Sequence, residues 1–252
     1  MTSPLPYIGG KSRLAKDIIS RFPEHETYCE AFAGAAWVFF TKEPGRFEVI
    51  NDLDDDLVAF YRVLQYHLNE FAQQFKFLLA SRTWFEDYKR QAEAGGLTDI
   101  QRAARYYYLQ RLCFGGRPKG RVFGTGPMHR PRINLIRLEE GLSDAHLRLA
   151  NATIEHLPWD QFVVRYDRPG TFFYLDPPYY LAPYYRHNFV LPDFERMADV
   201  LAGVKGKFLL SINDMPEMRE VFKRFNIEAV SLKYSAAKNG ATVGRELLIR
   251  NY

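Results

Sequence analysis

Short apolar segments alternate along this chain with segments of helical periodicity, and this alternation constrains the fold more than any other feature. Apolar segments of strand length lie at 27–34, 46–52, 171–175 and 206–214. Between them, apolar residues recur at helical spacing, for example at Leu14, Ile18, Ile19 and Phe22. Such alternation predicts an α/β protein with a mainly parallel sheet flanked by helices, and it places ligands beyond the carboxyl ends of the strands.

The size and composition fit one sizeable core with a smaller lobe. The chain has 252 residues, of which 47% are hydrophobic and 25% are charged. No apolar run approaches the roughly 20 residues that span a bilayer, and no apolar stretch follows a basic start, so we expect a cytoplasmic protein. Cys29 and Cys113 lie far apart without a Cys or His cluster beside them, so we expect neither a metal site nor a disulfide.

The positive charge is concentrated in one segment rich in Gly and Pro, residues 115–137. This segment has six Lys and Arg residues and no acidic residue, and without these six the formal net charge of +4 becomes −2. A loop or hairpin of this kind is suited to following phosphates, although a charged loop that only contacts solvent has the same composition. The residues expected to contact phosphates are Arg117, Lys119, Arg121, Arg130 and Arg132.

Two strand ends have residues suited to a nucleoside cofactor. The small residues around Gly34 would let the backbone approach a ligand closely, but small residues at such a turn also serve packing alone. Asp52, at the end of the next strand, is placed to accept hydrogen bonds from ribose hydroxyls. The complete GxGxxG fingerprint is missing, which disfavours an oxidoreductase that binds NAD.

The most specific motif is Asp176-Pro177-Pro178-Tyr179, which follows the apolar run Phe172 to Leu175. The prolines fix the backbone and remove two donors, so the carbonyl of Pro177 is left as an acceptor beside the carboxylate of Asp176. Two such acceptors can each take one N–H of a planar amine, and Tyr179 offers a flat face for stacking an aromatic base. The motif therefore predicts chemistry on a planar –NH2 group.

The sequence resembles the Dam-like, or D12 class, DNA adenine-N6 methyltransferases. Similarity to the family's motifs is found in YIGGK (Tyr7 to Lys11), EAFAGA (Glu30 to Ala35), Asn51-Asp52 and DPPY, and further in RYYYLQRLCFGGR, GKFLLSIND and RELLIRNY. The motif order resembles the group with a target-recognition region inserted into the catalytic domain. Gly115 departs from the pattern, because the family commonly has Asn at this position, and this departure predicts relaxed target selection.

The resemblance implies a Rossmann-like S-adenosylmethionine-dependent methyltransferase sheet, formed by 1–56 and 146–252, with a helical and hairpin DNA-recognition region at 57–145. It implies transfer of a methyl group from S-adenosylmethionine to the N6 amine of a flipped-out adenine in double-stranded DNA, without a metal ion. The implied catalytic residues are Asp176, Pro177, Pro178 and Tyr179. The implied cofactor residues are Tyr7, Gly10, Lys11, Phe32, Gly34, Asp52, Trp159 and Asp176, and the implied DNA contacts are Arg117, Lys119, Arg121, Arg130 and Arg132.

Three other functions remain open at this point. An amino-methyltransferase acting on RNA or on a protein glutamine uses similar motifs, but YIGGK and the basic segment disfavour it. An oxidoreductase would need a better glycine fingerprint. A DNA-binding relative without catalysis is disfavoured by the intact DPPY motif and by Asp52.

Overall fold

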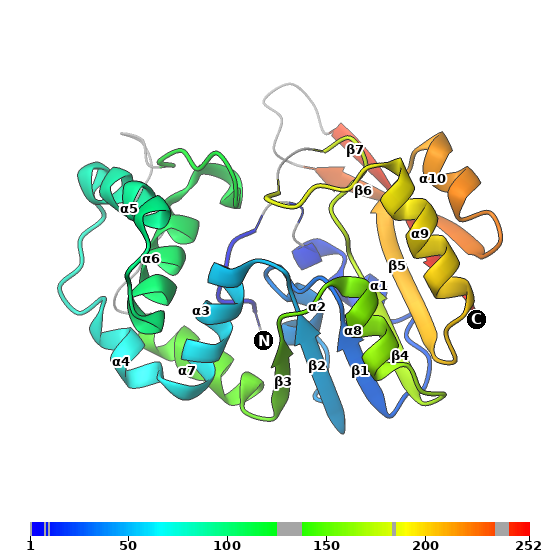
Figure 1. Cartoon of the computed structure of the whole chain (residues 1–252), viewed down its shortest axis with the longest axis horizontal. Helices are drawn as coiled ribbons and strands as arrows, with labels where there is room; N and C mark the ends of the chain where they lie inside the picture. The colour runs from blue at the N-terminus through cyan, green and yellow to red at the C-terminus, as the bar shows by residue number, and fades with distance from the viewer. Residues whose placement is uncertain (1, 8, 10, 125–137, 183–184, 235–241) are drawn as a thin grey trace.

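A seven-stranded sheet forms the centre of the computed structural model, which describes the chain except residues 1, 8, 10, 125–137, 183–184 and 235–241 (Figure 1). The strand order is β3-β2-β1-β4-β5-β7-β6. The strands are β1 (Thr27–Glu30), β2 (Phe47–Asn51), β3 (Ala152–Glu155), β4 (Thr171–Leu175), β5 (Lys207–Asn213), β6 (Asn226–Tyr234) and β7 (Thr242–Arg250).

The sheet is mainly parallel, which confirms the fold class predicted from the alternation. β1 to β5 pair in parallel, whereas β7 lies antiparallel between β5 and β6. The chain continues from β1 to β2 and β3 on one side, and from β4 to β5 on the other. The order of this Rossmann-like sheet thus reverses between β1 and β4, and ligands bind beyond the carboxyl ends of the strands at such a reversal.

Helices cover both faces of the sheet and form a lobe beside β3 (Figure 1). Those that pack on the sheet are η1 (Lys11–Arg13), α1 (Ala15–Ile19), α2 (Trp37–Thr41), α8 (Trp159–Tyr166), α9 (Leu191–Ala202) and α10 (Pro216–Val221). The lobe has α3 (Asp55–Tyr66), α4 (Leu68–Gln73), α5 (Arg82–Ala94), α6 (Asp99–Leu112) and α7 (Leu138–Leu149), and the short η2 (Phe114–Gly116) follows α6.

The two faces of the sheet contribute to separate hydrophobic cores. Tyr28, Phe172 and Tyr174 belong to the core formed with α1, α2 and the helical lobe. Cys29 and Phe173 belong to the core formed with α8, α9 and α10. Because β4 is covered on both faces, all five of its residues are buried, which explains why its sequence is a continuous apolar run.

The helical lobe shares its core with the sheet. Phe60 of α3 stacks on Tyr107 of α6 with ring centroids 5.7 Å apart, and Phe71 of α4 packs against the same two rings. These rings belong to one core with Tyr28 of β1. The lobe therefore holds a fixed position beside the sheet. The boundaries 57–145 for a recognition region stay a prediction. They do not coincide with the ends of helices, because α3 begins before Leu57 and α7 continues past Ala145.

Local structure differs from the sequence-based expectation at three places. The helix expected from Leu57 begins at Asp55, because the Asp54 carboxylate accepts hydrogen bonds from the backbone N–H groups of Asp56 and Leu57. The helical periodicity that begins at Leu14 gives only five residues of α-helix, α1. Helix α8 occupies a segment in which the sequence analysis identified none.

Candidate active site

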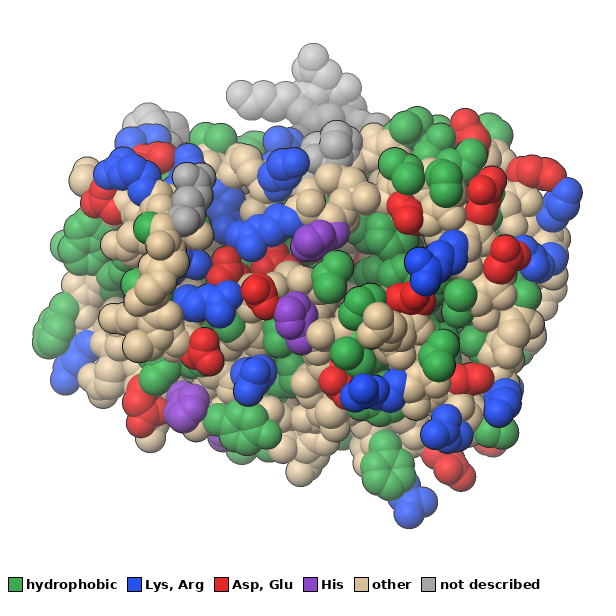
Figure 2. Space-filling model, viewed as in Figure 1, with side chains coloured by type: hydrophobic (Ala, Val, Ile, Leu, Met, Phe, Trp, Pro, Cys, Tyr) green, Lys and Arg blue, Asp and Glu red, His purple; other side chains and the backbone are tan. Residues whose placement is uncertain are grey.

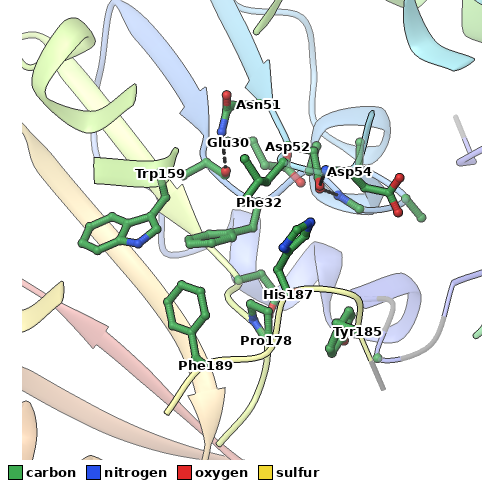
Figure 3. A pocket seen from close by; sticks show the side chains of 18 of the residues that line it. Glu30, Phe32, Asn51, Asp52, Asp54, Trp159, Pro178, Tyr185, His187 and Phe189 are labelled. Carbon is green, nitrogen blue, oxygen red and sulfur yellow. Dashed lines mark hydrogen bonds between the residues drawn. The ribbon is translucent and has the colours of Figure 1, made fainter. Parts of the chain in front are cut away.

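A cavity of about 310 Å³ opens at the carboxyl ends of β1, β2 and β4 (Figure 3). Figure 3 shows Phe32, Trp159 and Phe189 gathered on one side of the cavity and Asp52 with Asp54 on another. The Phe32 and Phe189 rings meet edge to face, with centroids 5.7 Å apart. The cavity thus combines an aromatic side with an acidic one at the position that the fold predicts for a ligand.

Asp52 lies directly after β2, as expected, and its carboxylate is held by the backbone. Oδ2 accepts a hydrogen bond from the N–H of Gly34 at 2.8 Å, and Oδ1 accepts one from the N–H of Asp54 at 2.9 Å. Burial raises the pKa of Asp52 to about 6, against these hydrogen bonds. Each oxygen keeps a second lone pair, so the carboxylate can still accept hydrogen bonds from a ligand in the cavity.

Gly34 has a left-handed backbone, with φ of 48°, and lies beneath the ring of Tyr7. A Cβ at this position would lie 3.3 Å from Tyr7 Cε1, closer than side chains normally pack. The small residue is therefore needed for the close approach of Tyr7 as well as for the turn. Both residues line the cavity, whereas Gly10 lies outside the described residues.

Lys11 is buried in η1 and reaches the DPPY motif. Its Nζ donates to Oδ1 of Asp176 at 2.8 Å and to the hydroxyl of Tyr179 at 2.5 Å, and it lies 3.7 Å from Oε2 of Glu246. Burial lowers the pKa of Lys11, but the carboxylates of Asp176 and Glu246 outweigh it, so the net shift is upward and the ammonium stays charged.

Asp176 lines the cavity immediately after β4. Its Oδ1 accepts hydrogen bonds from Lys11 and from the hydroxyl of Ser211, the latter at 3.0 Å. Burial raises the pKa of Asp176, while Lys11 lowers it. Among the described residues, the hydrogen bonds to this carboxylate both reach Oδ1, which leaves Oδ2 for a ligand.

The other residues of the DPPY motif take different positions. Pro178 lines the cavity, but Pro177 and Tyr179 are not among the lining residues. The hydroxyl of Tyr179 accepts from Lys11, and the ammonium of Lys11 lies 4.7 Å from the Tyr179 ring centroid. Tyr185 lines the cavity instead, 6.4 Å from the ring of Tyr7, and the sequence analysis did not identify it.

Glu30 is a second lining residue that the sequence analysis did not single out. It ends β1, and Oε2 accepts hydrogen bonds from the Tyr28 hydroxyl at 2.7 Å and from the Phe39 N–H at 3.1 Å. Burial raises the pKa of Glu30 to about 8. Its place at the end of a buried strand, within EAFAGA, is the signal that identifies it.

The basic segment does not present all of its cations in the same way. Arg117 and Lys119 are exposed, but Arg121 is buried, with 7% of its surface accessible. Arg121 donates to Oε1 of Gln110 and lies over the ring of Tyr106. Its burial disfavours the phosphate contact expected from the sequence. Arg130 and Arg132 lie outside the described residues.

Charges of both signs border the cavity (Figure 2). Figure 2 shows acidic side chains in the hollow at the middle of this face, with Lys and Arg side chains around them. Arg186, from the segment after DPPY, forms ion pairs with Asp54 at 3.3 Å and Asp56 at 3.2 Å, and so fastens that segment to α3. These two ion pairs were not foreseen from the sequence, because Arg186 lies 132 and 130 positions from Asp54 and Asp56 along the chain.

The family model for D12 class N6 adenine-specific DNA methyltransferases matches residues 7–236. The chain belongs to this family. Membership confirms the predicted activity, methylation of the N6 amine of adenine in DNA, and with it S-adenosylmethionine as the methyl donor. With this activity assigned, the alternative functions left open by the sequence, an oxidoreductase among them, are no longer needed to explain its motifs.

Curated relatives are similar over nearly the whole methyltransferase chain. A type II methyltransferase of Lactococcus lactis is 27% identical, with 98% of this chain and 94% of the relative covered. A type II methyltransferase of Paramecium bursaria Chlorella virus is 26% identical, with 97% of both covered. The DNA adenine methylase of Escherichia coli is 25% identical, with 94% and 90% covered.

In the part of the chain that the structure describes, no group of three or more His, Cys, Asp and Glu side chains is placed to hold a metal ion. Within the same residues, no helix has the length and apolar character that crossing a membrane requires.

Proposed function

We propose that this methyltransferase acts on double-stranded DNA and flips its target adenine into the cavity beside Asp176. The observation that supports this most directly is the carboxylate of Asp176, whose Oδ1 is held by Lys11 and Ser211 while Oδ2 remains for the substrate amine. This arrangement supports a role for Asp176 as a preoriented acceptor for the reacting nitrogen.

The cavity residues fit S-adenosylmethionine by their chemistry. The cofactor has an adenine ring, a ribose diol and two positive centres, which require aromatic faces, acceptors and carboxylates. Phe32 and Trp159 supply the aromatic faces, and Asp52 supplies acceptors for the diol. The ring of Tyr7 packs against the turn at Gly34. When bound, the cofactor supplies an activated methyl group, so the protein contributes orientation and charge.

The target amine is held by two acceptors. Asp176 Oδ2 and the carbonyl of Pro177 each accept one N6 hydrogen, which directs the nitrogen lone pair toward the methyl group. Lys11 favours the ionised form of Asp176, because its ammonium opposes the upward effect of burial on the pKa of that carboxyl, although the net shift of this pKa is upward. Pro178 lines the cavity beside this position, and Tyr185, which also lines it, offers an aromatic face for the flipped base.

The helical lobe and the hairpin after α6, residues 112–124, would recognise the DNA, and both lie within the expected region 57–145. Arg117 and Lys119 are exposed, and the basic segment that contains them has no acidic residue. Their chemistry suits phosphates, so they contribute to affinity and register more than to sequence selection.

Methyl transfer by Asp176→Ala tests the proposal. We expect the rate of transfer from radiolabelled S-adenosylmethionine to unmethylated duplex DNA to fall about 10²- to 10³-fold, because a preorganised polar contact is lost. Asp214→Ala is the matched control: Asp214 follows β5 as Asp176 follows β4, but its carboxylate bonds to Arg219. Near-normal turnover by folded Asp176→Ala would refute the role of Asp176 as acceptor for the target amine. Faster methylation of single-stranded than of duplex DNA would refute double-stranded DNA as the substrate.

A further inference from the structure

Gln110, near the end of α6, is a completely buried amide that bonds to three separate segments. Its Nε2 donates to the carbonyl of Pro6 at 2.9 Å and to the carbonyl of Gly116 at 2.6 Å. Its Oε1 accepts from Nη2 of Arg121 at 3.2 Å. One side chain, with no accessible surface, thus connects the N-terminal segment with both sides of the hairpin.

The hairpin itself is a closed unit. The N–H of Phe114 donates to the carbonyl of Val122 at 2.8 Å, and the N–H of Gly124 donates to the carbonyl of Leu112 at 2.7 Å. Arg121 lies in the second arm of this hairpin, with its guanidinium over the ring of Tyr106 on α6. A displacement of the hairpin therefore moves Arg121, and with it the hydrogen bond that Oε1 of Gln110 accepts.

On its other side, Gln110 reaches the segment that forms one wall of the cavity. A Cβ on Gly116 would lie 2.9 Å from the carbonyl carbon of Pro6 and from the N of Tyr7, so the hairpin and this segment are in backbone contact. The same segment places the Tyr7 ring over Gly34. Four residues beyond Tyr7, Lys11 holds Asp176. The N-terminal segment thus links the hairpin to both the cofactor turn and the DPPY motif.

We propose that Gln110 is a positioning residue that couples engagement of DNA by the hairpin to binding of the cofactor. DNA that fixes the hairpin fixes Arg121 and Gln110, and through Pro6 it fixes Tyr7 over the cofactor turn. This inference rests on the proposed DNA-binding role of the hairpin and on the proposed cofactor role of Tyr7. Coupling between two sites is reciprocal, so the cofactor must raise the affinity for DNA by the same factor.

The test measures a coupling ratio. S-adenosylhomocysteine serves as probe, because it keeps the ribose and amino acid groups but has no methyl group to transfer. Its dissociation constant is measured by calorimetry with and without saturating duplex DNA of mixed sequence. In the wild-type protein we expect DNA to tighten binding about 5- to 150-fold, the usual range for such coupling.

Gln110→Glu is the decisive variant, since it has the same shape but cannot donate to both carbonyls: an ionised carboxylate donates to neither, and a protonated carboxyl donates to only one. We expect its ratio to fall to about 1, while it still binds both ligands separately. Gln65→Glu is the matched control, because Gln65 is buried in α3 and also donates through Nε2 to two backbone carbonyls, those of Leu149 and Ala152. Its stability should fall, but its coupling ratio should equal that of the wild type.

The outcomes separate the two proposals. If the wild-type protein does not bind S-adenosylhomocysteine, the proposed cofactor site is wrong and the inference fails with it. If the wild-type protein binds the probe but DNA leaves its affinity unchanged, only the coupling is refuted. The coupling role of Gln110 is also refuted if Gln110→Glu keeps the wild-type ratio, or if Gln65→Glu loses it. Should Gln110→Glu not fold, Arg121→Met removes the contact through which the hairpin is proposed to act on Gln110 and leaves the bond to Gly116 in place. An unchanged ratio in that variant overturns the inference.

Discussion

Lys11 and Asp176 are 165 positions apart in sequence, yet Nζ of Lys11 lies 2.8 Å from Oδ1 of Asp176. Only 4% of the lysine side chain and 20% of the aspartate side chain are accessible. A buried ion pair contributes little net stability against an apolar replacement, but removal of one partner leaves a buried charge without compensation. The pair is therefore better explained by the orientation and charge of Asp176 than by stability.

Replacement of Lys11 by Met is expected to abolish methylation and to lower the free energy of unfolding by about 3–5 kcal/mol. Urea denaturation and methyl transfer measure the two effects. Lys42→Met is the control, because Lys42 is as buried as Lys11 and pairs with Glu48, and neither Lys42 nor Glu48 lines the cavity. It should lose stability and keep its activity once folded. Wild-type turnover by folded Lys11→Met would rule out the orienting role.

Asp52→Asn should weaken cofactor binding about 10- to 100-fold, because hydrogen bonds to a charged acceptor contribute about 1.5–3 kcal/mol each. Since the pKa of Asp52 is raised to about 6, the wild-type carboxylate is protonated below that pH and charged above it. Affinity for S-adenosylhomocysteine should therefore rise with pH through about 6 in the wild-type protein and stay flat across this range in Asp52→Asn. Calorimetry over a pH series decides, and equal profiles would contradict the ribose role.

Glu30→Gln should change how stability depends on pH. The pKa of Glu30 is raised in the folded protein from 4.5 to about 8, so the folded state binds the proton more tightly than the unfolded state. Stability must then decrease as pH rises between these two values, by about 1.4 kcal/mol for each pKa unit. The Gln variant lacks this loss, so its melting temperature should exceed that of the wild type at pH 8.5 more than at pH 5. A parallel dependence in both proteins would show that Glu30 does not titrate there.

The double variant Arg117→Ala with Lys119→Ala should bind DNA more weakly and with a flatter dependence on salt. Each lost phosphate contact lowers the slope of log affinity against log salt by about 0.9. Lys205→Ala with Lys207→Ala is the control, because these exposed lysines lie at the opposite edge of the sheet, where β5 begins. Filter binding over a salt series gives the slopes. If the hairpin variant matches the control, the segment is a solvated loop.

Gly115→Asn should fold normally and narrow the choice of target. Gly115 has φ of 70°, a conformation that Asn tolerates well, and nothing lies within 4 Å of a Cβ there. The wild-type enzyme should methylate adenines in many contexts, with a preference confined to one or two neighbouring bases. Mapping of N6-methyladenine on unmethylated genomic DNA compares the two. A single motif of four or more fixed bases for the wild-type enzyme would show the prediction wrong.

The parts of the site that follow strand ends could be predicted from the sequence. Asp52 and Asp176 were identified because buried strands are apolar runs and the residue that follows such a run lies at the ligand-binding edge. The mainly parallel sheet followed from the alternation, whereas the order of its strands did not. These inferences need only local pattern and the general rules of α/β folds.

Contacts that depend on the relative placement of distant segments could not be predicted. The bonds of Lys11 to Asp176 and of Gln110 to Pro6 depend on packing between elements, which leaves no periodic signal in the sequence. The composition of the basic segment also does not show which of its cations face solvent. Arg121 is buried instead, because Gln110 and the ring of Tyr106 supply it with an acceptor and a flat surface.

The two ends of the helical lobe are fastened together at its base. Gln65 of α3, the helix by which the chain leaves the sheet, donates to the carbonyls of Leu149 and Ala152, where the chain returns from α7 into β3. The lobe between these two points therefore begins and ends at positions that are fixed beside the sheet. The lobe is thus anchored at its base, so a change in the loops between its helices leaves the sheet and its chemistry in place.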